Sequence, residues 1–396
     1  MKKWILIASL YVAQLLPVAF FGQTLPVFLR QQGASLESIG LISLLSLPWT
    51  LKVLWSPIVD RYGWTRWGHY KSWILAMQSL LVVTLIFCAT LDIQTNFSLL
   101  TVGIVLVISL AATQDIATDA LAIKLLKPSE RGLGNSIQTA GAYLGGILGG
   151  GGLLVLLGYW GWTGSLLSMA LVTLLLLIPV FFHREKPASY QSEPNLSWKM
   201  FLKFFSRQGI GRWVVILLLY MMGVTIANTM FRPLLVDLGL TLAQIGVMNG
   251  IVAYSAGLVG AFVGGFLMKP LGRKKALIVF SVLMAISNAS FILPTLGFTS
   301  LPVLYLISMG CQFAYSMALI PLYTIMMDNS RLLTAGFDYT LQVSIVFVGS
   351  LIVGGLSGFM AEAIGYQGTF AISVAIALVS VAVIGKTFND SQEEIP

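Results

Sequence analysis

Apolar residues gather along the chain in long runs that are separated by short polar stretches. A helix needs about 20 apolar residues to cross the hydrocarbon core of a bilayer. A window of that length predicts an all-α membrane protein with twelve transmembrane helices, numbered here as spans 1 to 12. The spans cover residues 4–28, 38–58, 72–91, 97–123, 134–157, 162–182, 213–236, 242–268, 276–294, 301–327, 336–358 and 365–385. We expect span 1 to be retained as a helix, because no clear small-residue cleavage site follows it.

A polar stretch divides the spans into two sets of six. Within it, Lys199, Lys203 and Arg207 recur every four residues, so a helix would align them on one face and apolar side chains on another. This pattern is typical of a helix that lies on an anionic membrane surface, and coupling between the two halves is its alternative role. The predicted domains are an N-terminal six-helix bundle at 1–182, a cytoplasmic linker with an interfacial helix at 183–212, and a C-terminal six-helix bundle with a short tail at 213–396.

The two halves of the chain resemble each other in sequence. A glycine precedes an Ile-Gly pair by six residues after span 1, at Gly33 and Ile39, and again after span 7, at Gly239 and Ile245. A second correspondence joins the loops after spans 2 and 8. Two six-helix halves related by such a repeat are typical of a transporter that rocks around a site near the middle of the membrane.

Composition and charge narrow the class of protein. The chain is 57% hydrophobic and only 10% charged, whereas soluble domains carry about 25% charged residues. This excludes a soluble enzyme and a nucleic-acid-binding module, and it makes membrane lipids the surroundings of the chain. Arg30 and Arg232 follow spans 1 and 7, but nearly all other basic residues lie near the termini or after even-numbered spans. We therefore expect both termini to be cytoplasmic.

Charged motifs follow spans 2 and 8. Asp60 and Arg61 follow the first of these spans, and Arg273 and Lys274 follow the second. These residues resemble the signature loop of the major facilitator superfamily, which reads roughly Gly-x-x-x-Asp-Arg-x-Gly-Arg-Arg, and each copy keeps part of it. The resemblance implies the major facilitator fold, with two pseudo-symmetric six-helix bundles. It also implies that the four residues form a cytoplasmic charge clamp, to which ordinary positive-inside loop chemistry is the alternative.

A further group of charges lies where span 10 ends and span 11 begins. Asp328 and Arg331 are at the cytoplasmic end of span 10, and Asp338 opens span 11. We predict that these residues form a loop network that gates the inner mouth of the transporter. A direct contact with substrate is the alternative role.

Two longer segments narrow the resemblance to one branch of the superfamily. Residues 47–61 and 113–120 are similar to the branch that holds muropeptide permeases, acetyl-CoA transporters and a group of siderophore importers. A length near 400 residues with twelve spans favours the siderophore group. The resemblance therefore implies a secondary transporter of a bacterial inner membrane that imports a siderophore or ferric siderophore, with protons as the coupling ion. Muropeptide uptake is the alternative, followed by efflux of a small amphipathic molecule.

Three ionisable residues lie well inside the predicted spans of the first half. Asp115 and Asp119 are four residues apart on span 4, so they share one helical face. Counting about 1.5 Å per residue places Lys52 on span 2 at the depth of Asp115. Charges inside a bilayer are costly and mark functional sites. We predict that Lys52 pairs with one of the aspartates and that one aspartate exchanges a proton. A static ion pair is the alternative, and the two roles can coexist.

The substrate cavity is expected from the family resemblance to lie between spans 1, 4, 7 and 10. Amide and aromatic side chains there suit a bulky amphipathic small molecule. The candidate substrate-binding residues are Gln14, Phe21, Gln23, Gln114, Tyr220, Asn228, Arg232, Gln312, Tyr315 and Tyr323.

Other classes of chemistry lack their sequence signals. The chain has no Gly-x-x-x-x-Gly-Lys-Ser/Thr motif for nucleotide phosphates and no Gly-x-Ser-x-Gly nucleophile motif. Its two histidines lie in predicted cytoplasmic loops, and its two cysteines lie in apolar runs. We therefore expect a transporter that is not an enzyme and uses no cofactor or metal. We also expect it to be a monomer.

Overall fold

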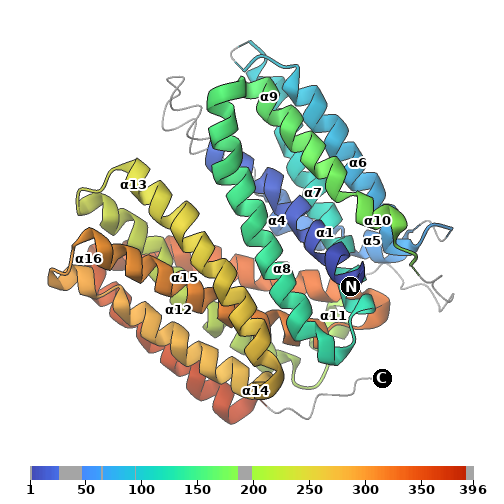
Figure 1. The fold of residues 1–396 in the computed structure, drawn as a ribbon. Coiled ribbons are helices and arrows are strands. Elements are labelled where there is room, and N and C mark those ends of the chain that lie inside the picture. Colours follow the sequence, from blue (N-terminus) through green and yellow to red (C-terminus); the bar gives the residue numbers. More distant parts are fainter. Residues whose placement is uncertain (1, 26–46, 64–65, 94, 186–198, 389–396) are drawn as a thin grey trace. The chain divides into compact units, whose positions relative to one another are not determined.

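The computed structural model describes residues 2–25, 47–63, 66–93, 95–185 and 199–388, and within these ranges every regular element is a helix. The all-α architecture expected from the apolar runs is therefore confirmed. Figure 1 shows the helices as coiled ribbons, coloured from blue at the N-terminus to red at the C-terminus. Helices satisfy all of their backbone polar groups internally, which a chain in hydrocarbon must do.

The first half of the chain contains four long helical stretches and several short ones. Helix α1 continues into a π-helical turn, η1, and α8 continues through a second one, η5, into α9. The bounds are α1 (Lys2–Ala19), η1 (Phe20–Thr24), α4 (Leu47–Leu51), η3 (Lys52–Leu54), α5 (Ser56–Arg61), α6 (His69–Ala89), α7 (Phe97–Leu125), η4 (Pro128–Glu130), α8 (Arg131–Gly146), η5 (Ile147–Gly152), α9 (Leu153–Leu176) and α10 (Ile178–Phe182).

The second half repeats this plan after a short helix, α11. A third π-helical turn, η6, joins α13 to α14. The bounds are α11 (Lys199–Phe205), α12 (Ile210–Asp237), α13 (Leu242–Gly246), η6 (Val247–Val252), α14 (Ala253–Ser290), η7 (Leu293–Leu296), α15 (Leu301–Asp328), η8 (Leu332–Thr334) and α16 (Ala335–Thr387).

Eight stretches of the described chain are long and apolar enough to cross a membrane, and three of them are 53 to 56 residues long. A single crossing needs only about 20 residues, so each of these three contains two crossings. The chain reverses within them at Gly161, Gly272 and Gly365, whose φ angles are 63°, 70° and 70°. Glycine adopts this left-handed conformation without steric cost. The stretches therefore account for eleven predicted spans, and residues 38–46 of span 2 lie outside the described residues.

The chain forms two compact units, each of which contains a short segment from the other half of the sequence. Unit 1 comprises Met1–Lys127, Ala140–Leu196 and Ser330–Thr340, and unit 2 comprises Pro128–Thr139, Ser197–Asn329 and Leu341–Pro396. The predicted division into bundles at 1–182 and 213–396 stays a prediction. Contacts between the two halves of the sequence thus occur inside each unit.

Each unit has its own apolar core. In unit 1, α6 packs against α7 and α9, and α1 packs against α7 and η5. Helix α1 also lies close to the end of α8 and to η5. A Cβ added to Gly145 would lie 2.8 Å from the backbone oxygen of Val12, and a Cβ added to Gly149 would overlap the backbone oxygen of Leu16. Small residues permit such helix contacts in membranes. In unit 2, Phe291 connects Phe231 and Phe370, with ring centroids 4.5 and 5.6 Å away.

Candidate functional site

Five buried polar residues of unit 1 form a connected group, the α7 cluster: Tyr11, Gln14, Lys52, Asp115 and Asp119. Lys52 forms an ion pair with Asp115. Gln14 Nε2 donates to Asp115 Oδ1 at 2.6 Å, and the Tyr11 hydroxyl donates to Asp119 Oδ1 at 2.6 Å. None of the five residues is more than 7% exposed. The structure therefore brings together the three ionisable residues that the sequence places inside the membrane.

Local structure explains how these side chains meet. Asp115 and Asp119 project from one face of α7, and α1 packs on that face. Lys52 opens η3, a short 3₁₀ turn between α4 and α5, and its ammonium also lies 4.9 Å from the centre of the Trp49 ring. Among the described residues, the ion pair with Lys52 is the only one that involves either aspartate of the cluster. The α7 cluster thus contains two carboxyl groups and one buried ammonium group, which pairs with Asp115.

A hydrogen-bonded chain extends from this region across unit 1. Gln114 Nε2 donates to Gln78 Oε1 at 3.0 Å, and Gln78 Nε2 donates to the backbone oxygen of Thr173 at 2.7 Å. Gln114 is 1% exposed, so the structure places it in a contact between α7, α6 and α9. Phe21 packs edge-on against Phe20 in the unit 1 core, whereas Gln23 is exposed beside Gly150. The substrate-binding role of these three predicted residues stays a prediction.

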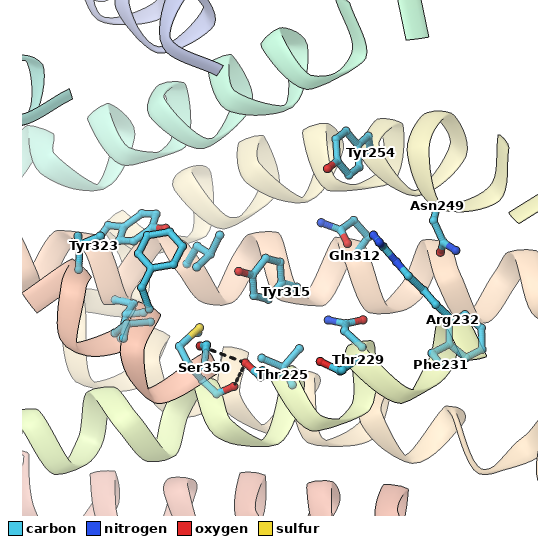
Figure 2. A pocket seen from close by; sticks show the side chains of 18 of the residues that line it. Thr225, Thr229, Phe231, Arg232, Asn249, Tyr254, Gln312, Tyr315, Tyr323 and Ser350 are labelled. Atoms are coloured by element: carbon cyan, nitrogen blue, oxygen red, sulfur yellow. Dashed lines mark hydrogen bonds between the residues drawn. The ribbon is translucent and has the colours of Figure 1, made fainter. Parts of the chain in front are cut away.

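Unit 2 contains a cavity of about 550 Å³, the α12 pocket, which lies between α12, η6, α14, α15 and α16 (Figure 2). Five of the predicted substrate residues line it, namely Asn228, Arg232, Gln312, Tyr315 and Tyr323. A sixth, Tyr220, is buried and donates to the backbone oxygen of Ala318 at 3.1 Å. Ligand pockets commonly have volumes of about 300 to 1,000 Å³, so this one can hold a substantial part of a small molecule.

The sequence analysis missed the pocket residues that come from other spans. Asn249 in η6, Tyr254 in α14 and Ser350 in α16 also line the cavity. Ser350 Oγ lies 3.3 Å from Thr225 Oγ1 and so links α16 to α12, as Figure 2 shows. The sequence signal that could have identified one of them is Asn249, a single amide inside an apolar run. We had limited the expected cavity to spans 1, 4, 7 and 10.

Asp60 of the first motif belongs to α5, and its carboxylate lies against the N-terminus of α16 within unit 1. Its carboxylate accepts hydrogen bonds from the backbone N–H groups of Gly336 and Phe337 at 3.0 and 2.7 Å. The Tyr70 hydroxyl donates to it at 2.8 Å. Helix N-termini favour anions because their first N–H groups have no partner within the helix. Burial raises the pKa of Asp60 to about 6 despite these bonds.

The remaining predicted gating residues fall into two separate groups. Arg331 binds Asp338 through Nε and a terminal nitrogen, both at 2.7 Å, within unit 1. Asp328 belongs to unit 2, where Arg273 and Arg131 both pair with it, the latter at 2.6 Å. The sequence analysis did not single out Arg131. Of the other two predicted gating residues, Arg61 lies over the Tyr62 ring, and Lys274 is half-buried and follows Arg273 in the chain.

Comparisons with known proteins place the chain in a family. The family model described as Major Facilitator Superfamily matches residues 7–339. The anhydromuropeptide permease of Escherichia coli (strain K12) is 28% identical over 373 residues, which cover 92% of this chain and 75% of that protein. The crystal structure of the transporter FucP in its outward conformation matches with a TM-score of 0.70 and 15% identity, covering 97% of this chain and 99% of that chain.

A bacterial homologue of the iron transporter ferroportin, crystallised in an outward-facing state with soaked iron, matches with a TM-score of 0.72 and 14% identity over 98% of both chains. At these identities the two solved structures show the fold alone. The family match covers well over half of the chain and agrees with the observed fold. This protein therefore belongs to the major facilitator superfamily.

Proposed function

We propose that this protein imports muropeptides, the sugar-peptide fragments of bacterial cell walls, across the inner membrane and that the import is coupled to protons. The observation that carries the proposal is the similarity to a muropeptide permease along 92% of the chain. The α12 pocket supports it, because its hydroxyl and amide groups can hydrogen-bond sugar and peptide groups while its aromatic rings cover sugar faces.

This proposal replaces siderophore import, which was our leading substrate hypothesis. That hypothesis was based on a chain length near 400 residues. The E. coli permease is longer, yet 75% of its length aligns with nearly all of this chain. A longer protein named a muropeptide permease thus aligns with this chain, so chain length is weak evidence about the substrate. The name of the aligned relative favours the muropeptide alternative instead.

The α7 cluster supports proton coupling. Burying a charge without a partner is costly, and this cluster has two carboxyl groups but one ammonium group. Asp115 contacts both Lys52 and the amide of Gln14, whereas Asp119 accepts a hydrogen bond from the neutral Tyr11. We infer that Lys52 is the counter-ion of Asp115 and that Asp119 exchanges the coupling proton.

Transport by the purified protein in proteoliposomes tests the proposal. A proton gradient directed inward should drive accumulation of a radiolabelled anhydromuropeptide, and a protonophore should abolish it. A ferric siderophore should not accumulate under the same conditions. Siderophore accumulation without muropeptide uptake would restore the earlier hypothesis, and flux of neither compound would contradict both.

The proposed orientation has a separate test. With both termini cytoplasmic, the loop near Asn96 faces the periplasm and the linker at Ser192 faces the cytoplasm. In an otherwise cysteine-free protein, an impermeant thiol reagent should label Asn96→Cys in intact cells and should label Ser192→Cys only after lysis. The reverse pattern would contradict the topology.

A further inference from the structure

Among the described residues that line the α12 pocket, Arg232 is the only charged one. Among the described residues, no carboxylate lies within ion-pair distance of its guanidinium group. The other polar side chains that line the pocket are amides, hydroxyls and tyrosines. Arg232 is five residues before the end of α12 at Asp237, which is about 8 Å along the helix axis. An arginine that faces a cavity in a membrane protein without an internal counter-ion is a candidate site for an anionic ligand.

The groups beside Arg232 strengthen this assignment. Figure 2 shows its side chain extending toward Gln312, with Asn249 above it. Asn249 Oδ1 accepts a hydrogen bond from Ser308 Oγ at 2.8 Å, whereas its Nδ2 is buried without a partner in the described structure. Asn249 lies in the π-helical turn η6, a conformation that occurs often at functional sites. The end of the pocket thus offers a guanidinium group and an unused amide donor.

The opposite end of the pocket has different chemistry. Figure 2 places Tyr323 at the far end from Arg232, with Tyr315 between them. Leu322, Met326 and Phe347 also line the cavity. A ligand that matches this arrangement has an anionic group at one end and an uncharged body with broad faces at the other.

We propose that Arg232, assisted by Asn249, binds a carboxylate of the peptide portion of the substrate, while the sugar portion lies toward Tyr315 and Tyr323. This inference rests on the proposed function, and it adds the part of the substrate that is recognised and the residues that recognise it. A carboxylate only accepts hydrogen bonds, so it complements a site made of donors. The planar guanidinium group can bind it through two parallel hydrogen bonds.

A pair of ligands isolates this interaction. Binding to the purified full-length transporter is measured for an anhydromuropeptide and for the same compound with its peptide carboxylates converted to amides. The wild-type protein should bind the carboxylate form about tenfold to a hundredfold more tightly, which is the range expected for a charge-assisted hydrogen bond. Arg232→Gln should remove this preference, and Arg232→Lys should retain part of it.

The amidated ligand also controls for folding, because its affinity should hardly change in Arg232→Gln. Arg212→Gln is a matched control, since Arg212 is an exposed arginine on the same helix and does not line the pocket. It should preserve the preference for the carboxylate form. Asn249→Leu should reduce the preference by a smaller factor than Arg232→Gln.

Two outcomes would overturn the inference while leaving the proposed function intact. In the first, the wild-type protein binds and transports the two ligands equally. In the second, Arg232→Gln keeps the full preference for the carboxylate form. If the wild-type protein neither binds nor transports either ligand, the proposed function fails and the inference fails with it.

Discussion

The polar groups of the α7 cluster in unit 1 and of the α12 pocket in unit 2 lie in different surroundings. In unit 1, Tyr11, Gln14 and Lys52 each contact one of two aspartates, and the whole cluster is closed to solvent. In unit 2, Arg232 faces an open cavity, and no carboxylate in the described part of the chain pairs with it. A network that is nearly satisfied can respond to one proton, whereas a charge that faces open space can respond to a ligand. The difference suits the two tasks of a coupled transporter.

The largest effect should come from Asp119→Asn, which keeps the size of the side chain but removes its titration. We expect gradient-driven accumulation of muropeptide to be abolished, while ligand binding and counterflow continue. The measurement compares accumulation and counterflow in the same proteoliposomes. If Asp119→Asn accumulates substrate normally under a proton gradient, the proton relay on α7 is wrong and the α7 cluster is a structural feature.

Asp115→Asn tests the other half of the cluster. It leaves the Lys52 ammonium group, which is 1% exposed, without a counter-ion. Removing one partner of a buried ion pair costs about 3 to 5 kcal/mol, so the unfolding temperature should fall steeply. Adding Lys52→Met should restore part of the stability, because the unpaired charge is then absent. A single variant as stable as the wild type would show that the pair is not buried in the membrane.

A pair of amide substitutions compares the units directly. Asn228→Leu in the pocket should weaken muropeptide binding by about two- to tenfold through the loss of a neutral hydrogen bond. Its free energy of unfolding should change by no more than about 0.5 kcal/mol. Gln114→Leu should do the reverse and destabilise the protein by about 1 to 3 kcal/mol, because Gln78 loses its donor. Equal effects of both variants on affinity would remove the distinction between the units.

The smallest effect concerns the pH dependence of Asp60. Burial raises its pKa from 3.8 to about 6, so the folded state binds this proton more tightly than the unfolded chain does. The stability that this provides is complete below about pH 4 and is lost as the pH rises through about 6. The free energy of unfolding of the wild type, minus that of Asp60→Asn, should therefore fall from pH 4 to pH 7. A difference that grows with pH would show that the hydrogen bonds from Gly336 and Phe337 outweigh burial.

Much of the fold could be predicted because a bilayer imposes a simple rule on the sequence. Each crossing needs a long apolar run. The reversals at Gly161 and Gly272 fall between predicted spans, and the reversal at Gly365 falls on the first residue of predicted span 12. The depth of Lys52 and Asp115 could be matched by counting residues, because the rise of a helix is constant. Depth alone does not identify Asp115 as the partner of Lys52. The structure adds that Lys52 lies in the 3₁₀ turn η3, between α4 and α5.

Contacts between distant parts of the chain could not be predicted in this way. Arg131 reads as an ordinary basic loop residue, and its pairing with Asp328 depends on a contact across 197 residues. Asp60 likewise meets the start of α16 across more than 270 residues. Hydropathy gives the depth of a residue along its helix but carries no information about its neighbours on other helices.

The π-helical turn η6 has a consequence for the transfer of site residues between relatives. Such a turn contains one more residue than the α-helical turn that it replaces. Each residue rotates a helix by about 100°, so a relative with an ordinary turn here would present a different face from Asn249 onward. For such a relative, the alignment should therefore have a one-residue gap within Val247–Val252 before ligand contacts are assigned to it by position.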